Sequence, residues 1–174
     1  DQGIPEANAM VLATCGSGNT PSTRIVLLKE FSETGGFVFY TNYNSRKGKA
    51  LAVNPRASLH VFWRELERQI SIEGPVEKVP AIQSDAYFRS RPRESQISAA
   101  LSPQSRELTD PESLKKQWQQ YHNSTRTIQR PSNWGGYRLL AERIEFWQGG
   151  EHRLHHRMVY TKTGQGWTRK RLAP

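Results

Sequence analysis

Short segments with the pattern of β-strands dominate the first half of this chain and return near its end, and their spacing constrains its fold more than any other feature. These segments share alternating or mainly apolar residues bounded by turn residues, and they lie at 9–15, 23–31, 37–41, 57–63, 68–73, 76–79, 137–140, 143–147, 158–161 and 167–172. Such alternation is typical of strands with one buried face. Gly35-Gly36 predicts a hairpin turn, and Gly74-Pro75 predicts a break between two strands.

Helical patterns interrupt the strands. Residues 45–53 form the first, with Ser45 as its N-terminal cap and Asn54-Pro55 as its stop. Residues 80–90 form the second. Pro92 predicts that this helix ends by Arg91, because the residue before a proline disfavours helical geometry.

A third helix is predicted to begin at Asp110-Pro111, where Asp can cap the helix and Pro suits its first position. A polar loop follows at 123–131. About seven or eight strands with two or three helices predict a mainly β, α+β fold, a closed antiparallel barrel with helical insertions. We expect a single domain over residues 1–174, since domains commonly have ~100–200 residues.

The charge of the chain predicts an anionic partner. Its 174 residues include 25 Lys and Arg against 16 Asp and Glu, a formal net charge of +9. Composition leaves nucleic acid, a membrane surface and small phosphorylated molecules open as partners. One cysteine, Cys15, excludes an internal disulfide and a cysteine-rich metal site. The sequence has no signal pattern and no apolar run near the ~20 residues of a membrane span, so we expect a reducing, cytoplasmic setting.

The first candidate phosphate site combines Arg24 and Lys29, at a predicted strand, with Ser45-Arg46-Lys47 at a predicted helix start. Arginine forks, lysine charges and the free N–H groups of a helix N-terminus all suit phosphate. Taken alone, the cluster fits a solvated charged rim better. The sequence contains no glycine-rich phosphate loop, so side chains would supply most of the contacts.

The second candidate is the spacing Tyr87, Arg91 and Ser95. On one continuous helix these side chains would share a face and offer two hydroxyls and a guanidinium group to one phosphate. Pro92 opposes such a helix, and an ordinary helix end with a packed tyrosine is the simpler interpretation of the spacing alone.

The densest cluster lies at 146–157 and holds three of the five histidines, two arginines and Gly149-Gly150. It has no nearby cysteine and no carboxylate at a zinc-like spacing, so we expect no metal site. Arg153 and His155 alternate and would face the same side of an extended segment, which suits a planar, negatively charged ligand. A polar turn at 102–105 is too weak a signal to carry a function by itself.

The motifs occur in the order of a known family. They are Arg24-Ile-Val-Leu-Leu-Lys29, Tyr40-Thr41-Asn42, Ser45-Arg46-Lys47, Glu67-Arg-Gln69, Ser90-Arg-Pro-Arg, Ser95-Gln-Ile97, Gln104-Ser105, Trp134-Gly-Gly136, Glu145-Phe-Trp-Gln-Gly149, Arg153-Leu-His155 and Arg171-Leu-Ala-Pro174. From about Glu6 to Pro174 the chain closely resembles the pyridoxine (pyridoxamine) 5′-phosphate oxidase family. That resemblance implies a dimeric FMN enzyme with an antiparallel split β-barrel.

The resemblance also implies site residues. The FMN-binding residues would be Arg24, Ile25, Val26, Leu27, Leu28, Lys29, Tyr40, Thr41, Arg46, Lys47, Gln69, Gln104, Ser105, Trp147 and Arg157, with some from a second subunit. The phosphate of the substrate would be held by Lys29, Tyr87, Arg91 and Ser95. Arg153 and His155 would lie over the pyridine ring as catalytic residues, and His155 suits tuning better because the high pKa of arginine opposes a general-base role.

The implied activity is oxidation of pyridoxine or pyridoxamine 5′-phosphate to pyridoxal 5′-phosphate. Hydride would pass to N5 of the flavin, and O2 would be reduced to H2O2. The implied assembly is a homodimer with flavin sites at the subunit interface, without nucleic acid or membrane partners. The +9 charge would then serve two small phosphate sites in each subunit.

The chain departs from the family pattern at two positions. His156 stands where the family normally has Asp, so a carboxylate that could orient Arg153 or Arg157 is missing there. Ser98 stands where the family has Gly, which could stiffen or shift its loop. The family's N-terminal segment is also missing, which we attribute to truncation.

Two other functions are considered. A related split-barrel flavin oxidase could act on another substrate, such as a phenazine precursor, although Tyr87, Arg91 and Ser95 would then have no phosphate to hold. A basic barrel with exposed aromatic residues could bind nucleic acid, but the aromatic residues here lie mostly within predicted strands.

Overall fold

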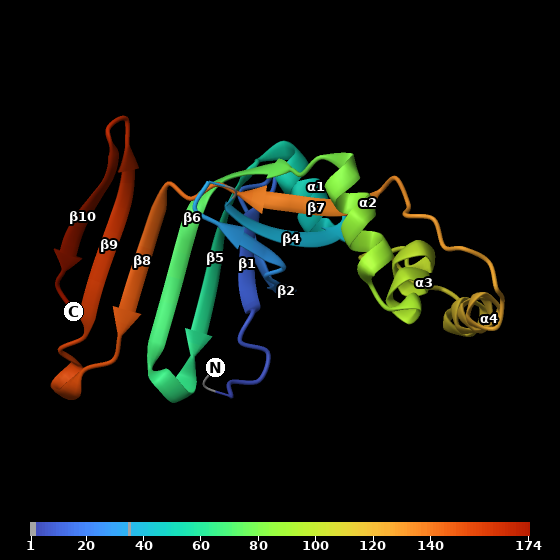
Figure 1. The fold of residues 1–174 in the computed structure, drawn as a ribbon, viewed down its shortest axis with the longest axis horizontal. Coiled ribbons are helices and arrows are strands. Elements are labelled where there is room, and N and C mark those ends of the chain that lie inside the picture. The colour runs from blue at the N-terminus through green and yellow to red at the C-terminus, as the bar shows by residue number, and fades with distance from the viewer. Residues whose placement is uncertain (1–2, 35) are drawn as a thin grey trace. The chain divides into compact units, whose positions relative to one another are not determined.

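The computed structural model describes residues 3–34 and 36–174, which form ten strands and four α-helices (Figure 1). The strands are β1 (Ala9–Cys15), β2 (Pro21–Leu27), β3 (Glu30–Ser32), β4 (Gly36–Asn42), β5 (Arg56–Trp63), β6 (Arg68–Lys78), β7 (Trp134–Leu139), β8 (Arg143–Gln148), β9 (His156–Thr163) and β10 (Gly166–Leu172). The helices are α1 (Arg46–Val53), α2 (Ala81–Ser90), α3 (Arg93–Leu101) and α4 (Pro111–His122). Gly35, in the predicted hairpin turn, lies outside the described residues.

One sheet contains all of these strands. Its main order is β10-β9-β8-β6-β5-β1-β2, and the pairings β6–β7, β7–β4 and β4–β3 extend it. Consecutive strands along the main order pair antiparallel. Figure 1 shows β5, β6, β8, β9 and β10 side by side. The predicted mainly β, α+β class is therefore confirmed.

The chain forms two compact units. The first contains the segments up to Phe39, Ala50–Glu77 and Arg138–Pro174, and the second contains Tyr40–Lys49 and Lys78–Tyr137. Strands β4, β6 and β7 and helix α1 each run from one unit into the other. The prediction of a single domain over residues 1–174 stays a prediction.

In the first unit, alternate residues of the strands build the core. Met10, Leu12, Leu59 and Ile72 are among its most deeply buried side chains. Because neighbouring residues of a strand point to opposite faces, the residues between them are left to face solvent or a partner. This alternation is the pattern that the sequence shows.

The predicted break at Gly74-Pro75 is wrong, because β6 runs through both residues and pairs Gly74 with Ala57. A Cβ atom at residue 74 would collide with the carbonyl oxygen of Leu140. Glycine is therefore needed here for the close approach of another backbone segment, and it does not mark a turn.

The predicted strand 23–31 is divided in the structure. After Leu27 the backbone changes partners, since the N–H of Leu28 donates to the Asn8 carbonyl at 2.8 Å and that of Lys29 to the Val38 carbonyl at 2.9 Å. The chain thereby leaves β1 and joins β4 through β3. Lys29 lies at this crossing and is exposed.

Helices form about half of the second unit, and two of their predicted ends are confirmed. Helix α2 ends at Ser90, and Arg91 is extended, with φ −74° and ψ 150°. The carboxylate of Asp110 accepts a hydrogen bond from the N–H of Ser113 at 2.8 Å and so caps α4. Helix α3 was not predicted from the sequence. Pro92 stops α2 and at the same time precedes the first turn of α3.

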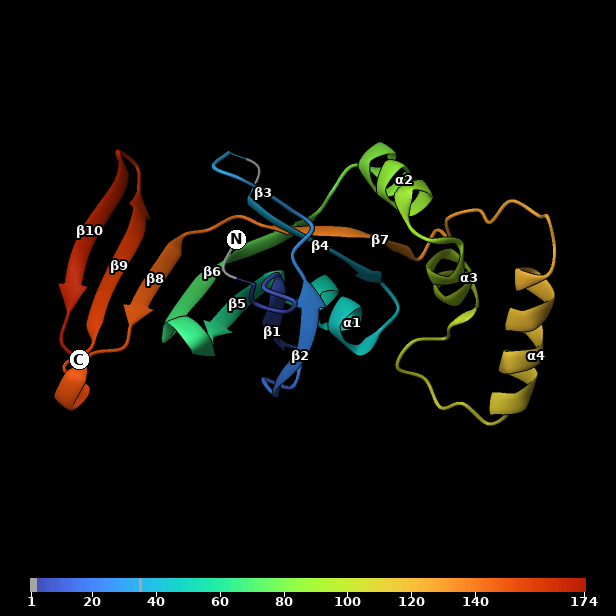
Figure 2. The same ribbon diagram turned by 60° about the horizontal axis from the view of Figure 1, so that its bottom comes forward.

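The core of the second unit packs α3 against α4 and β7. Phe88, Ile97, Ile128 and Trp134 form its buried cluster, and Trp118 packs against it from α4. Figure 2 shows α3 and α4 as neighbours. This packing holds the end of α2, where Arg91 lies.

Candidate active site

Three predicted cofactor residues form one row across the sheet of the first unit. Gln69 on β6 pairs directly with Trp147 on β8, and Trp147 pairs directly with Arg157 on β9. Directly paired residues share a face of the sheet, so an amide, an indole ring and a guanidinium group lie next to one another. A cavity of about 290 Å³ adjoins this row, and Ser71, Glu145 and Pro174 also line it.

His155 lies beside this row. Its ring centroid is 4.6 Å from that of Trp147, at an interplanar angle of 43°. The backbone N–H of Gly150 lies 3.3 Å from its Nδ1 atom, which can accept the hydrogen bond. The structure thus brings a predicted catalytic histidine together with a predicted cofactor residue.

Arg153 lies in the short 3₁₀ turn Glu151–Arg153, where it is exposed. It has φ 63°, and His152 before it has φ 54°. Two consecutive non-glycine residues in the left-handed region are uncommon, and strain of this kind often occurs at functional sites. The turn places Arg153 two residues before His155.

Arg157 is held by a carboxylate. Oε1 of Glu145 accepts from Nε of Arg157 at 2.8 Å and lies 2.7 Å from its Nη2 atom. Oε2 of Glu145 accepts from Nη2 of Arg143 at 2.6 Å, and Nη1 of Arg143 donates to Glu73 at 2.8 Å. Nη1 of Arg157 donates to the carbonyl of Ala173 at 3.1 Å. Burial raises the pKa of Glu145, but hydrogen bonds from Arg143 and Arg157 outweigh it and hold the pKa below its ordinary value of 4.5.

Glu145→Gln should therefore destabilise the fold most at neutral pH and least in acid. The unfolded state takes up this proton first as the pH falls, so the stability from Glu145 is present above about pH 4.5 and is lost below it. Urea unfolding of both proteins between about pH 7 and about pH 3 measures this difference. Glu142→Gln, which removes an exposed carboxylate paired with Arg56, is the control. If the difference in unfolding free energy between the wild type and Glu145→Gln stays constant with pH, the lowered pKa of Glu145 is contradicted.

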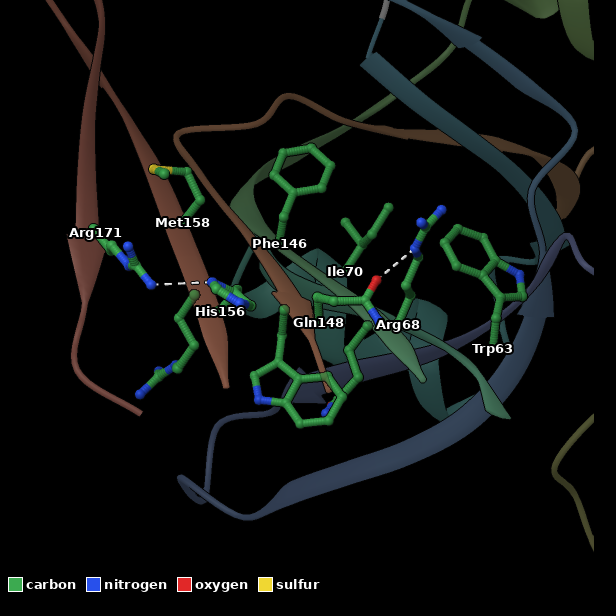
Figure 3. Close-up of a pocket in the computed structure, with 11 residues that line it drawn as sticks. Trp63, Arg68, Ile70, Phe146, Gln148, His156, Met158 and Arg171 are labelled. Carbon is green, nitrogen blue, oxygen red and sulfur yellow. Dashed lines mark hydrogen bonds between the residues drawn. The ribbon is translucent and has the colours of Figure 1, made fainter. Parts of the chain in front are cut away.

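His156 lies beside Arg171, as Figure 3 shows. Its Nδ1 atom lies 3.0 Å from Nη2 of Arg171, while Nε of Arg68 donates to Gln148 at 2.6 Å. Both pairs line a pocket of about 530 Å³ whose apolar wall includes Phe146 and Met158. Adjacent residues of β9 face opposite sides, so position 156 does not serve Arg157. The carboxylate that orients Arg157 comes from Glu145.

The predicted FMN segment from Arg24 to Lys29 lies on β2 and the following crossing. Nη1 of Arg24 donates to Thr14 Oγ1 at 2.8 Å, and its Nη2 donates to Ser22 Oγ at 2.6 Å. Val26 is buried, whereas Ile25, with 62% of its surface exposed, and Leu27 face outward. Leu28 is half-buried and Lys29 is exposed.

In the second unit, a buried lysine gathers other predicted cofactor residues. Nζ of Lys47 lies 3.1 Å from Thr41 Oγ1, 3.2 Å from Gln104 Oε1 and 3.5 Å from Ser45 Oγ. Only 9% of Lys47 is exposed. Ser45 Oγ also accepts from the N–H of Gly48 at 3.3 Å, which confirms Ser45 as the cap of α1. Lysine is rarely buried unless other groups pair with its charge, and three side-chain oxygens lie near this one.

Two predicted cofactor residues lie outside this cluster of contacts. Arg46, at the first position of α1, is exposed. Ser105 is exposed and has φ 67°. Each is the sequence neighbour of a residue in the cluster, Arg46 of Lys47 and Ser105 of Gln104.

Stacked rings hold Arg91. The rings of Tyr40 and Tyr87 stack at 3.9 Å, and Trp134 is nearly parallel to both. The guanidinium carbon of Arg91 lies 4.8 Å from the centre of the Trp134 ring. Burial lowers the pKa of Arg91, against the influence of Tyr87. Among the described residues, no hydrogen-bond partner meets its buried Nη1 atom.

Ser95 lies in the first turn of α3, where its N–H donates to the carbonyl of Pro92 at 3.0 Å. Tyr87, Arg91 and Ser95 thus flank the junction of α2 and α3 and do not share one continuous helix. Trp134 completes this group, and sequence reasoning gave it no role. The sequence signal that could have pointed to Trp134 is the motif Trp134-Gly135-Gly136. In the structure both glycines are closely packed, because a Cβ atom at Gly135 would collide with Tyr43 and one at Gly136 with Val79.

Two further features bear on the kind of site. In the described residues, no three His, Cys, Asp or Glu side chains gather where they could hold a metal ion. No helix in the described ranges has the length and apolar character of a membrane span.

Solved structures define the class of this fold. It is similar to a pyridoxamine 5′-phosphate oxidase-related, FMN binding protein from Nostoc punctiforme PCC 73102, with a TM-score of 0.80 and 15% identity over 98% of this chain and 90% of that one. It is similar to PhzG from Burkholderia lata 383 in complex with tetrahydrophenazine-1-carboxylic acid, with a TM-score of 0.95 and 31% identity over 98% of this chain and 84% of that one. The fold is the antiparallel split barrel of flavin-binding proteins, as predicted.

Sequence comparisons identify the family. The pyridoxamine 5′-phosphate oxidase family matches residues 1–125, and the pyridoxine 5′-phosphate oxidase C-terminal dimerisation region matches residues 134–174. A relative from Rubrobacter xylanophilus, a pyridoxine/pyridoxamine 5′-phosphate oxidase, is 49% identical over 99% of this chain and 80% of its own length. This chain belongs to the pyridoxamine 5′-phosphate oxidase family and is an oxidoreductase.

Proposed function

We propose that the protein oxidises pyridoxine 5′-phosphate and pyridoxamine 5′-phosphate to pyridoxal 5′-phosphate, with FMN as its cofactor. The alcohol and one O2 give the aldehyde and H2O2, and the amine also takes up water and releases ammonia. The observation that carries this proposal is Arg91, a partly buried guanidinium group with an unpartnered nitrogen beside Tyr87. An unpaired buried donor is unfavourable unless a ligand supplies the acceptor, and a phosphate ester has the matching charge.

The side chains fit a phosphorylated flavin. Lys47, Thr41 and Gln104 combine a buried ammonium group with a hydroxyl and an amide, a donor set that suits phosphate oxygens. Trp147, Gln69 and Arg157 offer an indole ring and polar groups on one face of a sheet, which suits a flat heterocycle. We assign these residues, with Arg24–Lys29, Tyr40, Arg46 and Ser105, to holding FMN.

Bound FMN would supply the redox chemistry, as acceptor of a hydride from C4′ of the substrate and donor of the electrons to O2. The residues of the chain then act by position. We assign Lys29, Tyr87, Arg91 and Ser95 to the substrate phosphate. Anchoring the substrate far from its reacting carbon uses binding energy to align the rings. We assign Arg153 and His155 to the face of the pyridine ring.

We also propose that the protein is a homodimer whose flavin sites include residues of both subunits. The support is the match of residues 134–174 to a dimerisation region, because this range contains Trp147 and Arg157. The row formed by Gln69, Trp147 and Arg157 would then contact flavin at the interface.

A second candidate substrate class comes from PhzG, which was solved with tetrahydrophenazine-1-carboxylic acid. Such a ligand has a carboxylate but no phosphate group. The partly buried Arg91 and the 49% identity to a pyridoxine/pyridoxamine 5′-phosphate oxidase favour the phosphorylated substrate.

The purified protein tests both candidates. We expect a yellow protein with the absorption spectrum of FMN that bleaches when pyridoxine 5′-phosphate is added without oxygen. In air it should form pyridoxal 5′-phosphate and H2O2 in equal amounts. A colourless protein that does not bind added FMN would contradict the proposal. Faster oxidation of a tetrahydrophenazine-1-carboxylic acid than of pyridoxine 5′-phosphate would favour the second candidate.

A further inference from the structure

We propose that Glu145 is a positioning residue of the flavin site, which it serves by holding the guanidinium group of Arg157 beside Trp147. This inference rests on the proposed function, because Arg157 is assigned to FMN there. Glu145 lies on β8 two residues before Trp147, so both side chains point to the same face. Arg157 reaches that face from β9, directly opposite Trp147.

The two carboxylate oxygens of Glu145 contact different arginines. Oε1 meets Nε and Nη2 of Arg157 at 2.8 and 2.7 Å, and Oε2 meets Nη2 of Arg143 at 2.6 Å. Only 13% of the Glu145 side chain is exposed, compared with 47% for Glu73 at the other end of the network. The Arg157 side chain is 32% exposed, so the pair is partly buried, and such a pair fixes geometry more firmly than a fully exposed one does.

These contacts leave a defined part of Arg157 for a ligand. An arginine side chain carries five N–H groups in a planar fork. Nε, Nη2 and Nη1 each direct one N–H to Glu145 or to the Ala173 carbonyl. Since five N–H groups are available and three meet these oxygens, N–H groups of Nη1 and Nη2 remain for a ligand. A flexible arginine would lose its rotational freedom when FMN binds, whereas an arginine already held loses less.

Glu145 also accounts for the departure at position 156. The missing Asp suggested that Arg157 lacks an orienting carboxylate, but His156 faces Arg171 on the opposite side of β9. Glu145 supplies that carboxylate from the neighbouring strand. The hydrogen bonds that hold Arg157 therefore do not depend on residue 156.

A double-mutant cycle on FMN binding tests the proposal. Kd for FMN is measured by quenching of flavin fluorescence for the wild type, Glu145→Gln, Arg157→Ala and the double variant. If Glu145 acts through Arg157, we expect Glu145→Gln to raise Kd about 10-fold in the wild-type background and by less than about 2-fold in the Arg157→Ala background. Glu73→Gln is the matched control, since it removes a carboxylate that binds Arg143 but not Arg157. It should leave Kd unchanged.

Equal effects of Glu145→Gln in both backgrounds would overturn the proposal, as would an unchanged Kd. Thermal unfolding without FMN shows whether each variant is folded. If Glu145→Gln is unfolded, Glu145→Asp replaces it, and the same dependence on Arg157 is required. Failure of the proposed function looks different, because the wild type itself would then not bind FMN.

Discussion

Arg91→Leu should raise the KM for pyridoxine 5′-phosphate by about 100-fold, which corresponds to about 2.7 kcal/mol of binding free energy. Hydrogen bonds to charged groups contribute about 1.5–3 kcal/mol each, and a partly buried guanidinium group can give a phosphate two of them. Its KM for unphosphorylated pyridoxine should change little, because that substrate lacks the group that Arg91 holds. Steady-state kinetics with both substrates measures the difference.

The fold should tolerate Arg91→Leu, since the change removes a guanidinium group with an unpartnered buried nitrogen over Trp134. Arg89→Leu, on the exposed side of α2, makes the same change of charge and is the control. A similar rise in KM for both substrates in Arg91→Leu would indicate damage to the site as a whole and would contradict a phosphate role. A similar rise in the KM for pyridoxine 5′-phosphate in Arg89→Leu would indicate that positive charge attracts the phosphate over a long range, without direct contact with Arg91.

Local features of this fold could be predicted from the sequence. Asp110 caps α4, Ser45 caps α1 and Arg91 ends α2 as expected, because each signal depends on atoms within about one helical turn. The wrong prediction at Gly74 has the same origin. Glycine serves both turns and close backbone approaches, and only the position of Leu140 shows which of the two applies.

The arrangement of the site depends on contacts between distant residues. Gln69, Trp147 and Arg157 form a row only because β6, β8 and β9 pair in one register, and a shift by one residue would turn each side chain to the other face. No local pattern assigns Glu145 to Arg157 or Trp134 to Arg91. The family resemblance predicts most residues of the candidate site, whereas the structure shows which residues contact them.

Lys47→Met should weaken FMN binding by about 100-fold and leave the fold without FMN nearly as stable as the wild type. Methionine keeps the length and apolar surface of the lysine stem, so packing around α1 is preserved. The variant loses hydrogen bonds to Thr41 and Gln104 but no longer buries an ammonium group, and these two effects oppose each other. Under the proposed function, the positive charge of Lys47 chiefly stabilises the bound phosphate of FMN. Removing that charge should therefore lower the affinity for FMN more than the stability of the fold.

Thermal unfolding with and without FMN measures both effects. At a concentration about 100 times the wild-type Kd, FMN should stabilise the wild type by about 2.7 kcal/mol. The same concentration equals Kd for the variant and should stabilise it by only about 0.4 kcal/mol. Lys49→Met, an exposed change on the same helix, should keep the full shift. If Lys47→Met also keeps it, the buried ammonium group is a structural feature of α1 and the phosphate is held elsewhere.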